Sequence, residues 1–300
     1  LRVSLLLFRS RPGGMTLHRS LFVTDKRYTR LYWLAVLLLA GGIALITVDT
    51  HKQHTERKQA AQLKKELLQV HAAAADSPAA VSSLTTPIPA GDPAPSERAV
   101  SSEAAQPERW ERLRTINQEV VGWLHVDGTE VDYPILQHAD NDYYLNVDAA
   151  GRQSMYGSIF MDYRSDFERS QQNIVIYGHN MLDGSMFGSL QRYKSRAFFN
   201  EHRVITLETP SQQTEWEIFS VYTINAQKDR VDVAYANEQG LLQAALSYRE
   251  KSLFPAPPFP HNPDRLLTLV TCSNETDDTR LVLHAFPKEE PSHALARQSS

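Results

Sequence analysis

Residues 265–286, RLLTLVTC-SNETDDT-RLVLHAF, decide the local fold of the C-terminal part of the chain. Two apolar, β-branched runs, 265–272 and 280–286, flank the seven polar residues 273–279, which predicts two strands joined as a hairpin. Because paired strands lie ~4.8 Å apart, we expect the end of the first run to lie beside the start of the second. The hairpin therefore places Cys272 next to Arg280.

Cys272 is the only cysteine among 300 residues, so it cannot form a disulfide within the chain. In a cytosolic protein a lone cysteine is most often an inert core residue. In an exported protein it indicates either an intermolecular bridge or a reactive thiol. The compartment therefore decides the interpretation of Cys272.

The N-terminal region predicts export. Residues 31–48, LYWLAVLLLAGGIALITV, carry no charge, and as a helix they would extend ~27 Å, close to the thickness of a bilayer core. A cleaved signal peptide is the nearest alternative, but no clear A-x-A site follows. We interpret 31–48 as an uncleaved transmembrane signal anchor and 1–30 as a cytoplasmic segment, with either Leu1 or Met15 as the start.

The remaining segments predict a tethered domain. Residues 49–107 are expected outside the cell, with a solvated helical stalk over 51–76 followed by a linker over 77–107 that is rich in Pro, Ala and Ser. Residues 108–287 have the length of one domain, and 288–300 resemble a disordered tail.

The domain over 108–287 is predicted to be mainly β with helices. An opening helix has the apolar face Trp110, Leu113, Ile116 and Val120, and a second helix fits 238–251. The predicted strands are 131–136, 154–162, 173–179, 203–208, 215–224, 265–272 and 280–286. Many short strands without a βαβ alternation favour a closed antiparallel or mixed barrel decorated by helices.

Composition restricts the partners. The net charge of −4 gives no basic face for nucleic acid, and the eleven histidines are scattered. The acidic run ETDD lacks the pattern of a calcium loop. We therefore expect no nucleic-acid partner, no metal and no cofactor.

Three residues at predicted strand ends have the chemistry of acyl transfer. Cys272 and Arg280 belong to the hairpin, and His179 ends the run NIVIYGH (173–179). A thiolate is a nucleophile that a nearby cation stabilises, a histidine transfers protons, and a guanidinium holds an oxyanion.

Each residue alone has a simpler interpretation. Arg280 alone is most simply an ion-pair partner of Asp277 or Asp278 on the surface. A histidine chosen from eleven is usually structural or merely exposed. Spacing cannot prove a cysteine–histidine pair, because such partners meet in space.

Several segments together resemble class B sortases, which are membrane-anchored cysteine transpeptidases of Gram-positive bacteria. The resemblance covers the whole domain and rests on VVGWLHVDGTEVDYPILQ, DNDYYLN, GSIFMDYR, NIVIYGHNMLDGSMFGSL and TLVTCSNETDDTRLVLHA, in that order behind an anchor. It implies a closed barrel of about eight strands, with an N-terminal helix and a helix before the strand of the catalytic cysteine.

The resemblance also implies residue roles. Cys272 would be the nucleophile, His179 the proton donor and acceptor, and Arg280 the oxyanion and substrate-backbone contact, while Asn141 and Leu145 would line the groove for the first residues of a sorting signal. The implied substrates are surface proteins with a C-terminal signal of the Asn-Pro-x-Thr type. The implied acceptor is an amine of a peptidoglycan precursor of the lipid II type. Class B enzymes often have serine at the position of Val270, which leaves the sorting motif open.

Three other functions stay open at this point. A pilin-polymerising sortase would use the same residues with a different acceptor. A cell-wall cysteine hydrolase would deliver the acyl group to water. A surface-tethered adhesion module would need none of the three residues, so an unreactive Cys272 would support it.

Overall fold

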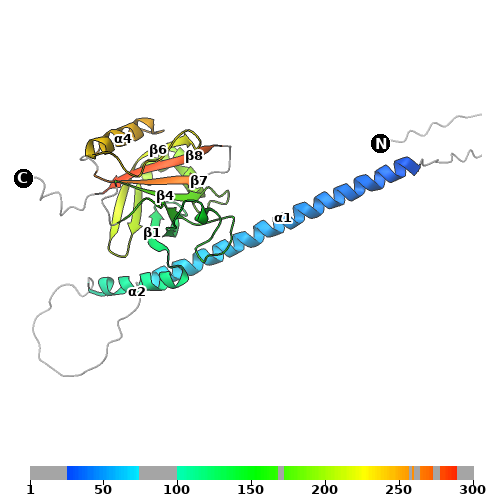
Figure 1. Ribbon diagram of the computed structural model, residues 1–300, viewed down its shortest axis with the longest axis horizontal. Helices are drawn as coiled ribbons and strands as arrows, with labels where there is room; N and C mark the ends of the chain where they lie inside the picture. Colours follow the sequence, from blue (N-terminus) through cyan, green and yellow to red (C-terminus); the bar gives the residue numbers. More distant parts are fainter. Residues whose placement is uncertain are drawn as a thin grey trace, which may run out of the picture. The chain divides into compact units, whose positions relative to one another are not determined.

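The computed structural model of the protein describes residues 26–73, 100–167, 172–256, 259, 264–272 and 278–288. Eight strands close into one barrel in the order β1-β2-β3-β4-β7-β8-β6-β5 (Figure 1). The strands are β1 (Val120–Val126), β2 (Asp132–Leu136), β3 (Phe160–Met161), β4 (Asn173–His179), β5 (Val204–Glu208), β6 (Gln213–Asn225), β7 (Leu266–Cys272) and β8 (Thr279–Pro287). The predicted closed barrel with helices is confirmed.

The barrel is mixed. β2 pairs with β3 and β4 pairs with β7 in parallel, whereas the other six pairs are antiparallel. β7 and β8 form the antiparallel pair that the sequence predicts, with Val270 opposite Val282. Parallel neighbours need a long crossover between them. The β4–β7 pair therefore joins two segments that are distant in sequence.

Two strand predictions were wrong. The strand predicted over 154–162 is reduced to Phe160–Met161, because Gly157 turns the chain with a φ of 55°. A Cβ at Gly157 would meet the backbone oxygen of Tyr144 at 2.5 Å. Strand β1 is not predicted from the sequence, because Val120 also fits the apolar face of the preceding helix. In addition, side chains on both faces of the run from 120 to 126 are mostly buried. A run of this kind has no alternation that distinguishes strand from helix.

The barrel encloses the main core. Inward-facing side chains of adjacent strands fill it, among them Ile174, Ile176, Leu267, Leu269 and Leu283, each at most 1% exposed. A smaller apolar cluster covers the outer face of the same strands and contains Val175, Tyr222, Val233, Val270 and Val282. Strands β4, β7 and β8 are thus apolar on both faces, which fixes their position in the sheet.

The N-terminal helix α1 (Lys26–Ala73) belongs to two compact units that divide between Gln53 and His54. In the first unit it contains a span of mean hydropathy 2.3 that is long and apolar enough to cross a membrane. In the second unit its residues Leu63 and Leu67 are 7% and 3% exposed and pack against the barrel with helix α2 (Val100–Ile116).

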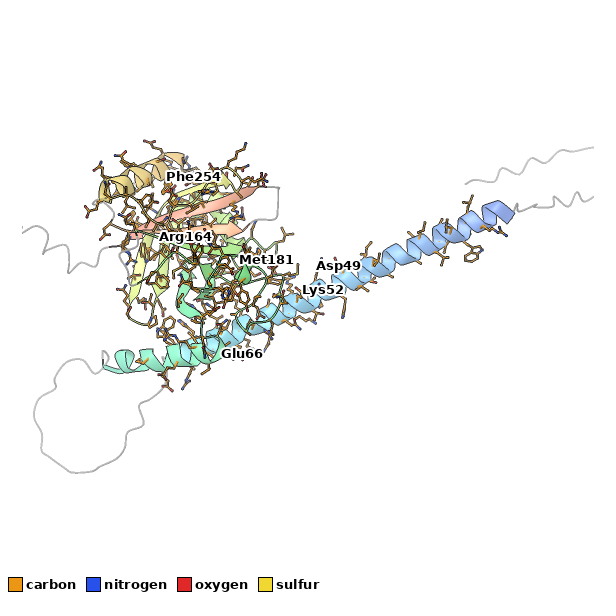
Figure 2. All side chains as sticks on the ribbon, viewed as in Figure 1. Asp49, Lys52, Glu66, Arg164, Met181 and Phe254 are labelled. Carbon is orange, nitrogen blue, oxygen red and sulfur yellow. The ribbon has the colours of Figure 1, made fainter. Side chains whose placement is uncertain are left out.

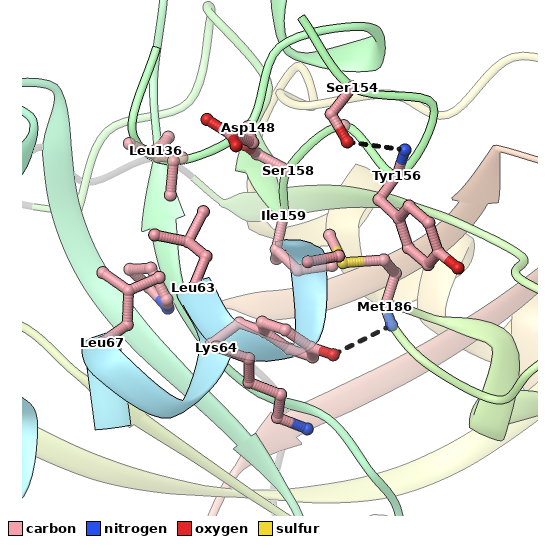
Figure 3. Close-up of a pocket in the computed structure, with 15 residues that line it drawn as sticks. Leu63, Lys64, Leu67, Leu136, Asp148, Ser154, Tyr156, Ser158, Ile159 and Met186 are labelled. Atoms are coloured by element: carbon pink, nitrogen blue, oxygen red, sulfur yellow. Dashed lines mark hydrogen bonds between the residues drawn. The ribbon is translucent and has the colours of Figure 1, made fainter. Parts of the chain in front are cut away.

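The solvated stalk predicted over 51–76 is therefore wrong for the part of α1 from residue 54 onward. Lys64 Nζ donates to the backbone oxygen of Glu130 at 2.6 Å, and His71 stacks on Trp123 with ring centroids 4.0 Å apart. A small pocket lined by Leu63, Lys64 and Tyr156 remains between helix and barrel (Figure 3). Helix α2 begins at Val100, inside the segment predicted as linker.

Helix α4 (Glu238–Lys251) matches the predicted range and contacts β6. Asn237 caps its N-terminus by accepting a hydrogen bond from the Gly240 amide at 2.9 Å. Tyr248 of this helix stacks on the buried His284 of β8, with the ring centroids 4.0 Å apart. Figure 1 shows α4 along the side of the barrel that β6 and β8 form. It thus covers the outer cluster of the β4–β7–β8 surface.

Candidate active site

The ends of two parallel strands bring the predicted acid and nucleophile together. His179 and Cys272 are register partners, each at the last position of its strand, β4 and β7. Directly paired residues in a sheet lie on the same face. The register therefore places His179 and Cys272 side by side at one end of the barrel.

Arg280 lies on the neighbouring strand. Thr268 to Val270 of β7 pair with His284 to Val282 of β8, and Thr271 Oγ1 accepts a hydrogen bond from the Leu281 amide at 2.9 Å. Continued by two residues, this register puts Arg280 across from Cys272. The structure thus brings all three predicted residues to adjacent positions on three neighbouring strands.

These positions lie on the outer face of the barrel. In β4, Ile174 and Ile176 point into the core, whereas Val175 packs in the outer cluster and Tyr177 lies partly buried against it. His179 follows Tyr177 by two residues and so shares its face. The site therefore lies at the strand ends of this outer face, where His179 and Arg280 are each half-buried.

The imidazole of His179 is half-buried and held by the backbone. Its Nε2 lies 2.6 Å from the carbonyl oxygen of Leu145, the last residue of the 3-10 helix Tyr143–Leu145. A carbonyl oxygen only accepts hydrogen bonds, so Nε2 carries the proton and donates a hydrogen bond to the Leu145 carbonyl. In the neutral ring Nδ1 is then the nitrogen that is free of a proton.

Arg280 is half-buried, and among the described residues it forms no ion pair. Asp278, which the simpler interpretation paired with it, instead accepts a hydrogen bond from Gln227 Nε2 at 2.6 Å. The other suggested partner, Asp277, lies outside the described residues. A guanidinium in this position is available to an oxyanion or a peptide carbonyl.

The two predicted groove residues take different positions. Leu145 contacts the site directly through its carbonyl on His179. Asn141 is bound within the protein: its Nδ2 donates to Asp162 Oδ2 at 2.9 Å, and its Oδ1 accepts from the Tyr163 amide at 3.0 Å. Asn141 thus has a fixed orientation before any peptide binds.

Val270 is 1% exposed and packs in the outer cluster. It has almost no surface to offer a bound peptide, so the interpretation of this position as a determinant of the sorting motif is not supported.

Sequence reasoning missed the carboxylate of Asp162, which accepts hydrogen bonds from Asn141, Arg164 and Tyr177. The segment GSIFMDYR contains Asp162 and contributes to the resemblance to sortases. Nothing in this segment indicates that hydrogen-bond donors from three segments converge on the carboxylate. As for metals, no group of three or more His, Cys, Asp or Glu side chains in the described part of the chain has the geometry of a binding site.

Comparison with known proteins agrees with this geometry. Residues 124–288 match the family described as "Sortase domain". The chain belongs to the sortase family. Sortase B of Listeria monocytogenes is 36% identical over 165 residues, which cover 55% of this chain and 67% of that protein. Sortase B of Staphylococcus aureus is 30% identical over 171 residues, with coverages of 57% and 70%.

Solved sortase B structures share the fold. A mutant form of Clostridium perfringens sortase B superimposes with a TM-score of 0.60 at 31% identity, over 64% of this chain and 92% of that one. The predicted relationship to class B sortases is confirmed. The chain is accordingly a sortase of class B, a family of cysteine transpeptidases.

Proposed function

We propose that this sortase cleaves a C-terminal sorting signal of the Asn-Pro-x-Thr type at the threonine carbonyl and transfers the protein to an amine of a peptidoglycan precursor. One observation carries the proposal: His179 and Cys272 are register partners at the ends of adjacent parallel strands, with Arg280 on the next strand.

Acylation uses the three residues in turn. The Cys272 thiolate attacks the threonine carbonyl carbon, forming an S–C bond and an oxyanion that Arg280 stabilises. When the oxyanion collapses, the C–N bond breaks, and the leaving amine takes a proton from His179. The product is a thioacyl-enzyme.

Transfer reverses the proton movement. The acceptor amine attacks the thioacyl carbon, His179 takes the proton from the nitrogen, and the C–S bond breaks to regenerate the thiolate. Because Nε2 is bound to Leu145, Nδ1 is the nitrogen that releases and regains the proton.

The groove and the anchor complete the proposal. Asn141 and Leu145 border the site from the segment before β3 and receive the first residues of the signal. The span over 31–48 holds the protein in the cell membrane as a single-pass anchor, with the catalytic domain outside the cell.

The test uses residues 54–300, because the part of α1 from residue 54 packs with the barrel. This protein is incubated with sorting-signal peptides, with and without amine acceptors, and the products are followed by mass spectrometry. We expect a thioacyl adduct on Cys272 and a transfer product that appears only with an amine. Cys272→Ala is expected to abolish cleavage and transfer while the domain stays folded.

Other outcomes favour the alternatives. Hydrolysis that a saturating amine does not divert indicates a cell-wall hydrolase. Transfer to a lysine side chain of a pilin-like peptide, in preference to a precursor amine, indicates a polymerising sortase. Turnover by the folded alanine variant refutes the assignment of Cys272.

A further inference from the structure

The carboxylate of Asp162 lies directly after β3, and its side chain is 0% exposed. Arg164 donates to it from Nε at 2.9 Å and from Nη2 at 2.8 Å, and the Arg164 amide adds a third bond at 2.9 Å. Asn141 Nδ2 donates at 2.9 Å and the Tyr177 hydroxyl at 3.1 Å. Five donors therefore surround one buried carboxylate.

This arrangement keeps Asp162 ionised. Burial raises the pKa of its carboxyl, but the hydrogen bonds from Arg164 and Asn141 outweigh that effect and hold the pKa below its usual range. A buried carboxylate without such partners would be strongly unfavourable. Arg164 is half-exposed at the surface of the barrel (Figure 2), so it supplies the compensating charge from outside.

Two of the five donors belong to the neighbourhood of the site. Asn141 precedes the 3-10 helix whose last residue, Leu145, binds His179. Tyr177 lies two residues before His179 on the same face of β4. The segment from 141 to 145 is thus tied to β4 at both ends, once through Asp162 and once through the Leu145 carbonyl.

Asp162 also fixes which way the Asn141 amide faces. Its Nδ2 points to Asp162, and its Oδ1 accepts from the Tyr163 amide. A reversed amide would place two acceptors together at Asp162 and two donors together at Tyr163. One Nδ2 hydrogen and one Oδ1 lone pair remain for a peptide.

We propose that Asp162 is a positioning residue for the acyl-donor peptide, which orients Asn141 and Tyr177 and so sets selectivity at the first position of the sorting signal. The proposal rests on the proposed transpeptidase function. Asp162 itself touches neither the substrate nor the reacting atoms, so its loss acts on peptide binding more than on the chemical steps.

The test replaces Asp162 with its isostere. Asp162→Asn keeps the shape of the side chain but brings an amide NH₂ against the donors of Arg164 or Asn141. We expect KM for the Asn-Pro-x-Thr peptide to rise ~10–100-fold, the scale of a lost hydrogen bond to a charged group, with kcat within about threefold. The ratio of kcat/KM between peptides with Asn and Leu at the first position should fall towards one.

The control is Asp148→Asn. Asp148 is also a largely buried carboxylate held by an arginine, with Arg152 Nη2 at 2.9 Å and two backbone amides, and in the described part of the chain no hydrogen bond or ion pair joins it to Asn141, Leu145 or His179. We expect this variant to keep the KM and the selectivity of the unmodified protein. The rate at which a methanethiosulfonate modifies Cys272 should be the same in the unmodified protein, in Asp162→Asn and in Asp148→Asn.

Each outcome decides the proposal. Unchanged KM and unchanged first-position selectivity in a folded Asp162→Asn protein overturn it, as does an equal change in the Asp148→Asn control. If Asp162→Asn does not fold, Tyr177→Phe removes a single bond to the carboxylate, and an unaltered KM in that variant overturns the proposal. Absence of any transfer by the unmodified protein contradicts the transpeptidase function instead.

Discussion

At the scale of single residues, the proposed mechanism depends on the geometry of the Arg280 guanidinium. A guanidinium presents a planar fork that binds an oxyanion and a backbone carbonyl together, whereas a lysine ammonium is a point charge. The half-buried position of Arg280 across from the end of β7 suits the fork.

We expect Arg280→Lys to lower kcat/KM ~10²-fold or more, the scale of a removed oxyanion donor. Peptide cleavage measured at several substrate concentrations checks this. Arg152→Lys, at an exposed arginine away from the site, is the matched control and should keep full activity. Near-native activity of Arg280→Lys would show that Arg280 acts only as a surface charge and not as an oxyanion contact.

His179→Ala is expected to lower kcat/KM at least as much, because it removes the proposed proton carrier of both half-reactions. The variant should still react with a small methanethiosulfonate, although more slowly. Added imidazole should restore part of the activity. Full activity without imidazole would show that another group transfers the proton.

A second histidine predicts a dependence of stability on pH. Burial, with a smaller contribution from Lys251, lowers the pKa of His284 to about 3. The ring is bound by Thr268 Oγ1 at 2.8 Å and by the Tyr222 hydroxyl at 3.0 Å. In the unfolded chain the imidazole takes up its proton near pH 6.5, so between about pH 6.5 and 3 the unfolded state binds more protons.

The free energy of unfolding should therefore fall as pH falls through this window, by on the order of 1 kcal/mol for each pH unit. Urea titrations at several pH values measure the slope. His284→Gln should flatten it, whereas His125→Gln, at an exposed position, should not. An identical slope in the His284 variant would assign the acid sensitivity to other groups.

The spacing of residues along the sequence predicts only part of the site. Cys272 and Arg280 are close in sequence, so a hairpin was enough to predict that they meet. His179 joins them through a parallel pairing across roughly ninety residues, which no local pattern encodes, and only the resemblance to sortases supplied it. The role of Asp162 could not be predicted, because its donors come from three separate segments.

At the scale of elements, the packing of α1 on the barrel is the largest departure from expectation. The sequence shows Leu63 and Leu67 at helical spacing, but two turns of pattern do not reveal what they face. The structure buries both against the barrel and α2, and it adds the ion pair between Arg57 and Asp183, at 3.3 Å, on the loop that follows His179. Residues 54–73 are therefore part of the folded domain.

Leu67→Ala is expected to lower the free energy of unfolding of the 54–300 protein by about 2 kcal/mol or more, the usual range for a buried leucine. Gln62→Ala, at an exposed position of the same helix, is the matched control. A protein that begins at residue 105 should have a free energy of unfolding lower than that of the 54–300 protein by a similar or larger amount. If the proteins that begin at residues 54 and 105 were equally stable, α1 would not contribute to the stability of the domain.

At the scale of the whole molecule, the single thiol serves as a reporter of topology. The proposed anchor over 31–48 and the proposed location of the catalytic domain outside the cell together predict that Cys272 faces the external medium. Since the chain has no other cysteine, any thiol label on it identifies one position.

A membrane-impermeant methanethiosulfonate added to intact cells should therefore label the full chain at Cys272. Cys272→Ala is the control and should stay unlabelled. Deleting residues 31–48 should remove the protein from the membrane fraction. Labelling of the full chain only after lysis would place the domain on the cytoplasmic side.

The in-register pairing of β4 with β7 also bears on folding kinetics. Contacts between distant parts of a chain form late, because the loop between them must first close. The proposed proton carrier and the proposed nucleophile both depend on this one long-range contact, so we expect the site to form only when β4 and β7 pair. During refolding, recovery of transferase activity should coincide with the slowest sheet-forming phase, and under the proposed topology a chain still crossing the membrane would carry an inert thiol.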